Sequence, residues 1–196
     1  MTTSSTLADL CARTWERTLE LNPTLATICG DERYDDRLED PGPAGRAARR
    51  ALAHEARAEA LALDPAALDE EERISRDLLA LIAGQEIADD DLRDDLVGVI
   101  SQHGHQSLLP HVVQIQRTDT PERVDRLIAR IEAYSVLTDT VIDLLAEGRA
   151  AGLTAARIVA DRVVDQLERS PKPVIAAVNG NAPMPVGAKT LCPEKT

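Results

Sequence analysis

The sequence predicts an all-α protein of about five helices that ends in an irregular tail. Apolar residues recur three and four positions apart through most of the chain, which is the spacing of one helix face. Ala, Leu, Val and Ile supply nearly all of the 43% hydrophobic residues, and Phe is absent. Five of the 11 prolines fall in the last 26 residues, where the helical spacing stops.

The first helix is expected to begin at Leu7, after a polar start that offers Ser and Thr as N-caps, and its apolar spacing continues through Leu19. Pro23 interrupts this helix, because the residue before a proline avoids the helical region. Residues 24–29 then form one or two further turns. Gly30 is expected to end them, since glycine adopts the left-handed conformation common after helices.

Residues 31–40 form a charged loop that a Pro-Gly-Pro sequence closes. The loop carries two arginines, Arg33 and Arg37, and six acids: Asp31, Glu32, Asp35, Asp36, Glu39 and Asp40. We favour an Arg–Asp network that fixes the loop. A calcium site is one alternative, since calcium prefers several oxygens on one turn, but the EF-hand order is missing. A paired-carboxylate hydrolase centre is another, although adjacent acids rarely converge on one point.

Two helices are expected to follow, at 44–63 and 68–88. The first is rich in Ala and Arg, and its arginines form a solvated face. The second has Asp69 as its cap and an apolar stripe made of Ile74, Leu78, Leu81 and Ile82. The acids after Ala88 oppose the helix dipole, so this helix is expected to fray or bend around Asp89.

Residues 96–116 indicate a loop followed by a short helix at 110–115. The clearest helix spans 121–148, with Thr120 as its cap and proline at its first position. Its stripe consists of Val124, Leu127, Ile128, Ile131, Tyr134, Val141, Ile142 and Leu145. A last helix at 154–169 follows a short link, so these two helices should form an antiparallel hairpin.

The chain divides into a helical domain, 1–169, and an irregular or disordered tail, 170–196. The tail holds one strand-like run at 172–180 without a partner strand, and a lone strand leaves its backbone groups unsatisfied. Its composition looks foreign to the helical part.

The formal net charge of −12 argues against binding to nucleic acid or to an anionic membrane, because both favour a basic protein face. No run approaches the roughly 18 apolar residues of a membrane helix. The first six residues do not resemble a secretory signal. Cys11, Cys29 and Cys192 form no CxxC pair, which favours reduced thiols in the cytoplasm.

Several short motifs occur in a definite order: Trp15-Glu16-Arg17, Leu21 to Thr27, Gly30 to Leu38, Leu63 to Leu68, Ile74 to Leu79, and Gln102-His103-Gly104-His105-Gln106. Together with the helical pair that follows, they resemble the N-terminal part of a large bacterial family, the domain of unknown function 885. The resemblance covers residues 7–169, and the run from Gly30 to Leu38 is its most specific piece.

This resemblance implies an almost wholly helical protein that is similar to zinc metallopeptidases, in which a His-Glu-x-x-His helix holds the zinc. The only His-Glu pair, His54-Glu55, is followed by Arg57 and Ala58. Metal-assisted hydrolysis needs two ligands one turn apart and a general base, so no catalytic residue and no cofactor site transfers to this chain. We expect a scaffold portion that stops before the catalytic motif and is inactive alone.

Two alternatives remain open. A helical interaction module would associate with itself or a partner through the helix at 121–149. A small metal-binding protein would use His103, His105 and His111, which lie within nine residues of one another. Imidazole is a common zinc ligand, although histidines in loops and caps more often bond the backbone.

Overall fold

The computed structural model describes residues 3–97 and 104–169. Over these residues the chain forms seven α-helices and three short 3-10 helices and no strand, which confirms the all-α prediction. The helix count exceeds the expected five because the short segments before the charged loop and before Thr120, residues 23–28 and 105–115, are helices of their own. The predicted tail, 170–196, and its strand-like run lie outside the described residues.

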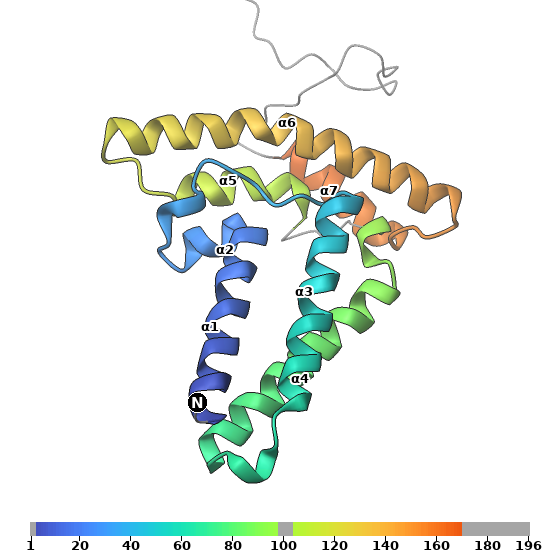
Figure 1. Ribbon diagram of the computed structural model, residues 1–196. Coiled ribbons are helices and arrows are strands. Elements are labelled where there is room, and N and C mark those ends of the chain that lie inside the picture. The colour runs from blue at the N-terminus through green and yellow to red at the C-terminus, as the bar shows by residue number, and fades with distance from the viewer. Residues whose placement is uncertain (1–2, 98–103, 170–196) are drawn as a thin grey trace, which may run out of the picture.

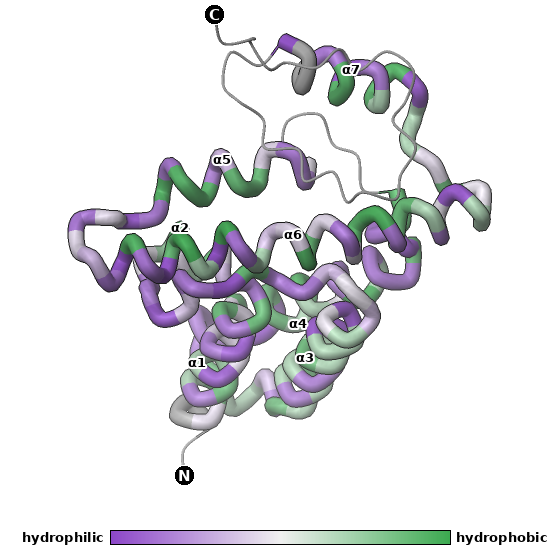
Figure 2. Tube along the Cα trace, turned by 90° about the horizontal axis from the view of Figure 1, so that it is seen from above, coloured by the Kyte–Doolittle hydropathy of each residue, from purple (hydrophilic) through white to green (hydrophobic). Residues whose placement is uncertain are grey.

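The helices form two layers (Figure 1). The lower layer consists of α1 (Thr3–Leu21), α3 (Pro43–Ala62) and α4 (Glu70–Asp91). The upper layer lies across their ends and consists of α2 (Pro23–Ile28), α5 (His105–Ile115) and α6 (Pro121–Ala150). Seen from above, α6 extends over the upper end of the lower layer (Figure 2).

The last described helix, α7 (Arg157–Glu168), turns back after Gly152, which has a left-handed backbone with φ of +75°. It runs antiparallel to α6, as the predicted hairpin requires, but it lies to one side of α6 (Figure 2). The pair α6 and α7 is not among the closely packed helix pairs, and none of the described side chains of α7 is buried.

Small side chains form the core between α3 and α4. One cluster joins Leu10 of α1 to Ala60 and Ala80, and a second joins Ala53, Ala56 and Ala83. Leu79 packs against both clusters. Alanine allows the two helix axes to approach closely, and α3–α4 is the most extensive helix contact of the structure.

The apolar stripe expected for α4 does not face this core. Ile74, Leu78, Leu81 and Ile82 are 62, 52, 58 and 45% exposed. The buried positions are instead Ala80 and Ala83. These small residues of α4 pack against the alanine-rich face of α3. The stripe that would ordinarily mark a buried face therefore lies on the surface.

The expected fraying of α4 at Asp89 is wrong, because the helix continues to Asp91. Arg46 of α3 donates from its Nε to Asp90 Oδ1 at 2.5 Å and from Nη2 to the Asp90 carbonyl oxygen at 2.9 Å. Arg46 thus neutralises an acid that would oppose the helix dipole and also caps a carbonyl oxygen at the end of the helix. At its other end, Asp69 and Glu72 form a capping box, so the predicted start is confirmed.

Helix α5 begins earlier than predicted, at His105 instead of residue 110, and contains Pro110 within it. The predicted cap of α6 is confirmed, with the Thr120 hydroxyl accepting from the Arg123 amide. Near its other end, a Cβ at Gly148 would lie 2.2 Å from the carbonyl oxygen of Leu96, so this glycine lets the two backbones touch.

Within residues 3–97 and 104–169, none of the helices combines the length and the apolarity needed to cross a bilayer.

Candidate functional site

Arg130 of α6 is the largest fully buried side chain among the described residues, with 0% exposure. Its Nε donates to the carbonyl oxygen of Arg37 at 2.7 Å, and its Nη2 donates to the carbonyl oxygens of Tyr34 at 2.9 Å and Pro23 at 3.3 Å. Its Nη1 donates to the Thr27 hydroxyl at 2.9 Å and to Gln116 Oε1 at 3.0 Å. All five guanidinium N–H groups thus have partners.

Thr27, Asp35 and Gln116 complete this group, which we call the arginine core. The Thr27 hydroxyl lies 2.6 Å from Asp35 Oδ1, and Gln116 Nε2 donates to the Asp35 carbonyl oxygen at 2.9 Å. Asp35 is 2% exposed and lies 3.8 Å from Arg130 Nη2, close enough to balance its charge. The arginine core therefore joins α2, the charged loop, α5 and α6.

Burial lowers the pKa of Arg130, and the negative charges of Asp35, Glu39 and Asp36 oppose that change. An arginine remains charged in proteins, so this is a buried cation whose stability depends on complete hydrogen bonding. This buried arginine was not predicted from the sequence. Its signal was the spacing of Arg130, Leu137 and Leu144, which recur every seven residues on the buried face of α6.

The charged loop is fixed by an Arg–Asp network, as the sequence indicates, but arginines of distant segments take part in it. Within the loop, Arg33 Nε donates to Asp31 Oδ1 at 2.9 Å, and Arg37 pairs with Asp36 at 3.4 Å. From α6, Arg123 binds both carboxylate oxygens of Glu32 at 2.9 Å.

The two remaining acids of the loop hold its neighbours in place. Glu39 accepts from the Thr24 hydroxyl at 2.8 Å. Asp40 accepts from the amides of Gly42 and Gly45 at 2.8 and 2.9 Å, which caps the start of α3. Gly45 is required there, because a Cβ would lie 2.1 Å from the Asp40 carbonyl oxygen.

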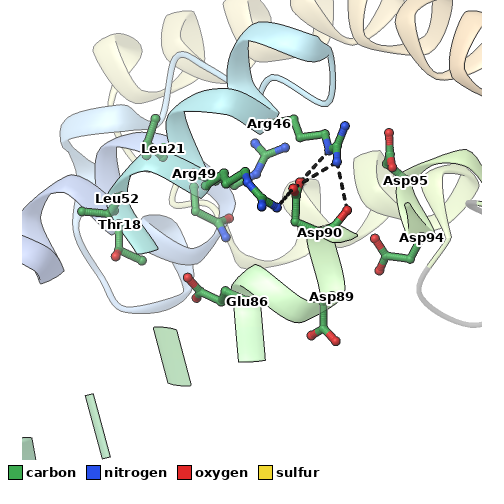
Figure 3. A pocket seen from close by; sticks show the side chains of 12 residues that line it. Thr18, Leu21, Arg46, Arg49, Leu52, Glu86, Asp89, Asp90, Asp94 and Asp95 are labelled. Carbon is green, nitrogen blue, oxygen red and sulfur yellow. Dashed lines mark hydrogen bonds and ion pairs between the residues drawn. The ribbon is translucent and has the colours of Figure 1, made fainter. Parts of the chain in front are cut away.

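A cavity of about 270 Å³ opens between α1, α3 and α4 (Figure 3). Its lining residues come from the three helices, from the residue that follows α1 and from the turn after α4: Thr18, Leu21, Asn22, Arg46, Arg49, Arg50, Leu52, Glu86, Asp89, Asp90, Asp94 and Asp95. Three of the arginines expected on a solvated face of α3, Arg46, Arg49 and Arg50, thus line this cavity. The cavity brings together positive side chains from α3 and negative ones from α4.

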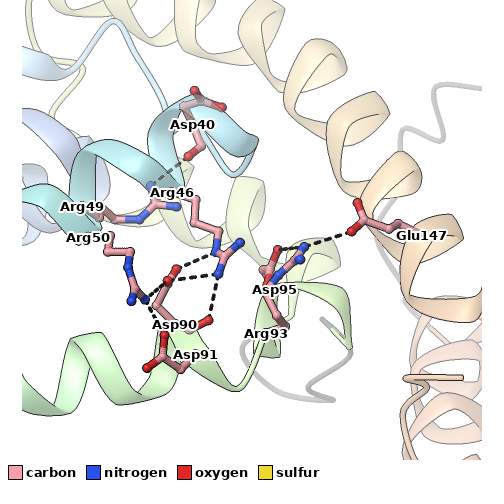
Figure 4. A network of polar contacts seen from close by, with 9 residues as sticks. All are labelled: Asp40, Arg46, Arg49, Arg50, Asp90, Asp91, Arg93, Asp95 and Glu147. Carbon is pink, nitrogen blue, oxygen red and sulfur yellow. Dashed lines mark hydrogen bonds and ion pairs between the residues drawn. The ribbon is translucent and has the colours of Figure 1, made fainter. Parts of the chain in front are cut away.

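Two of these arginines are held by one aspartate (Figure 4). Arg46 and Arg50 both lie 2.5 Å from oxygens of Asp90. Partial burial raises the pKa of Asp90, but hydrogen bonds from Arg46 and Arg50 outweigh it, so the pKa falls below its usual value. Arg93 makes a separate bridge, pairing with Asp95 at 2.9 Å and with Glu147 of α6 at 3.2 Å.

Arg49 and Glu86, which also line the cavity, have no oppositely charged partner among the described residues. Arg49 donates to the carbonyl oxygen of Asp40 at 2.8 Å, and no carboxylate of the described residues pairs with it. Partial burial, and then the negative charge of Asp89, raise the pKa of Glu86. The cavity thus presents one cation and nearby carboxylates that other side chains leave available.

The predicted histidine cluster is only partly described, because His103 lies outside the described residues. His105 stacks on Tyr134 with ring centroids 4.8 Å apart, and its Nε2 lies 2.9 Å from the Thr138 hydroxyl. Burial lowers the pKa of His105, against an opposing effect of Glu39. His111 is exposed on α5. In the part of the chain that the structure describes, no three His, Cys, Asp or Glu side chains converge as a metal site would require.

Of these two sites, the arginine core has no donor left for a ligand, whereas the cavity retains charged groups and space. Comparison with known proteins gives one family match. The sequence profile of a family described as "Bacterial protein of unknown function (DUF885)" matches residues 23–182. No curated protein sequence matches the chain.

Proposed function

Because the chain belongs to DUF885, a family of bacterial proteins of unknown function, we propose that it is a non-catalytic helical scaffold of a metallopeptidase-like protein. The metallopeptidase likeness rests on the order of motifs in the sequence. Cys11 and Cys29 are free thiols, which supports a cytoplasmic location.

The observation that carries this proposal is the apolar face of α4, defined by Ile74, Leu78, Leu81 and Ile82. These residues are separated by four, three and one positions, so they form one stripe, and each is at least 45% exposed. A contiguous apolar stripe on a surface is typical of a contact with another protein surface. A scaffold that packs against the catalytic part of such a protein would cover it.

The one His-Glu pair supports the non-catalytic part of the proposal. His54 and Glu55 lie on an exposed part of α3, and Glu55 pairs with Arg17 of α1. A hydrolytic zinc needs converging ligands, an open coordination position and a general base. Glu55 contributes instead to the packing of α1 against α3.

An activity assay tests the proposal directly. The purified chain would be supplied with zinc and offered a set of peptides and activated esters. We expect no hydrolysis above that of zinc in buffer. Hydrolysis that copurifies with the chain, and that a chelator abolishes, would contradict the proposal.

A second candidate function is self-association through α6, in the segment 121–149. Val124, Ile128, Ile131 and Ile142 are exposed on this helix. Three of them follow four- and three-residue spacing, which suits pairing with another helix. In this case the chain is an interaction module.

Light scattering across a concentration series distinguishes this candidate. We expect a dimer that Ile128→Glu converts to a monomer, because a charge at the centre of an apolar contact is costly to bury. Asp125→Asn, one turn away, is the control and should leave the dimer intact. A monomer at every concentration would rule out this second function.

A further inference from the structure

We propose that the cavity between α1, α3 and α4 binds a small zwitterion of the α-amino-acid class. Its carboxylate pairs with Arg49, its ammonium group pairs with Glu86, and its side chain lies against Leu21 and Leu52. This role is separate from the scaffold function and does not depend on it.

The anionic end of the ligand is assigned to Arg49 because the neighbouring arginines are already engaged. Arg46 and Arg50 are fixed on Asp90, whereas Arg49 donates, among the described residues, only to the carbonyl oxygen of Asp40. A guanidinium has five N–H donors in a planar fork, so most of those of Arg49 remain for a ligand carboxylate.

The cationic end is assigned to Glu86, which approaches the cavity from α4 on the wall that faces α3 (Figure 3). No arginine or lysine of the described residues pairs with Glu86 or Asp89, and the two carboxylates repel each other. An ammonium group placed beside them would remove that repulsion.

The positive and negative groups of the cavity lie on different helices, an arrangement that favours an organic ligand with two charged ends over a metal ion. In the described residues, no three acidic or histidine side chains come close enough to hold a metal ion. A cation that is tethered to a carboxylate matches a cavity with Arg49 on one helix and Glu86 on the facing helix.

The size and the apolar wall narrow the ligand class. The volume of about 270 Å³ lies just below the range of roughly 300–1,000 Å³ that is typical of pockets for drug-sized ligands. Leu52, which is 7% exposed, and Leu21 supply an apolar surface. An amino acid with a branched aliphatic side chain therefore matches Arg49, Glu86 and the apolar wall of the cavity.

The test uses L-leucine as the probe and isothermal titration calorimetry of the full chain as the measurement. We expect saturable binding. 4-Methylpentanoate lacks the ammonium group and 3-methylbutylamine lacks the carboxylate. Each should bind about tenfold more weakly or worse, because each lacks one charge-assisted contact.

Two variants locate the site. Arg49→Gln and Glu86→Gln should each weaken L-leucine binding about tenfold. Arg73→Gln changes an exposed arginine of α4 outside the cavity and should bind as the parent chain does. Because Arg49→Gln also removes the bond to Asp40, Glu86→Gln provides the variant that leaves the start of α3 unchanged.

Three results would overturn the proposal. The first is the absence of saturable L-leucine binding up to about 10 mM. The second is equal affinity for L-leucine and 4-methylpentanoate, which would indicate a simple anion site. The third is L-leucine binding that survives both Arg49→Gln and Glu86→Gln, which would place the ligand elsewhere.

Discussion

The α3–α4 hairpin and the arginine core hold their segments together by different physical means. In the hairpin, alanines let two helices approach closely, and the contact is apolar and without directional bonds. In the arginine core, one buried cation bonds to the carbonyl oxygens of residues 23, 34 and 37 and to two side chains. The hairpin should therefore be sensitive to side-chain volume, and the arginine core to the loss of donors and charge.

The largest effect is expected for Arg130→Met. This change leaves Asp35 without its buried cation and three carbonyl oxygens without a donor, so it should lower the free energy of unfolding by about 3–5 kcal/mol. Urea unfolding measures the loss. Arg149→Met, at an exposed position of the same helix, is the control and should change stability by no more than about 0.5 kcal/mol. A loss below about 1 kcal/mol for Arg130→Met would show that the arginine core is not essential to the upper layer.

A smaller effect is expected when the hairpin is overfilled. Ala56→Leu adds volume at a position that is 2% exposed, so it should cost about 1–3 kcal/mol. Ala58→Leu makes the same change two residues later, on the exposed face of α3, and should be close to neutral. Thermal unfolding of the two variants compares them. Equal melting temperatures would contradict the packing described for α3 and α4.

Asp90→Asn tests a charged contact within the α3–α4 hairpin, because it removes the carboxylate that Arg46 and Arg50 bind at the end of α4. The pKa of Asp90 is lowered in the folded chain, so its stabilisation is present above the unfolded value of about 3.9 and is lost as the pH falls through the folded value. The variant should lose about 1–2 kcal/mol at pH 7 and show a flatter fall in stability below pH 4.

Asp91→Asn provides the comparison for that experiment. Asp91 pairs with Arg50 but its side chain is 63% exposed, so its removal should matter less at every pH. Urea unfolding from pH 3 to pH 7 measures both variants. If the free energy of unfolding fell equally steeply below pH 4 for Asp90→Asn and the parent chain, the role assigned to Asp90 would be contradicted.

The smallest effect is expected on the apolar face of α4. The double variant Leu78→Gln/Leu81→Gln should change the stability of the isolated chain by no more than about 0.5 kcal/mol, because neither side chain is buried. Leu79→Gln, between them, should cost about 2 kcal/mol or more, because Leu79 packs against both alanine clusters. A large loss in the double variant would show that this face is covered in the folded chain.

The boundaries of several helices could be predicted from the sequence because they depend on local chemistry. Asp69 with Glu72, and Thr120 with its following proline, act within a few residues, and the structure contains both caps. The orientation of α4 could not be predicted in this way. Its stripe of large residues satisfies the period of a helix, but the alanines of α3 determine which face is buried.

The candidate sites were harder to predict, because their residues are far apart in the sequence. Arg130 bonds to atoms between 93 and 107 positions earlier, in the segment from Pro23 to Arg37. The run from Gly30 to Leu38 is the most specific part of the family resemblance. The residue that bonds to its backbone, Arg130, lies in α6, whose sequence gives no sign of this contact. The cavity likewise depends on arginines that the sequence places on a solvated face.

The glycine at position 148 has a mechanical consequence. Because backbone meets backbone where α6 crosses Leu96, no side chain can change rotamer to absorb a displacement. Leu96 lies in the turn that follows α4, and Arg93 of the same turn donates a hydrogen bond to Glu147 of α6. A displacement of α6 toward Leu96 would therefore press on the turn that carries Asp94 and Asp95, two residues that line the cavity.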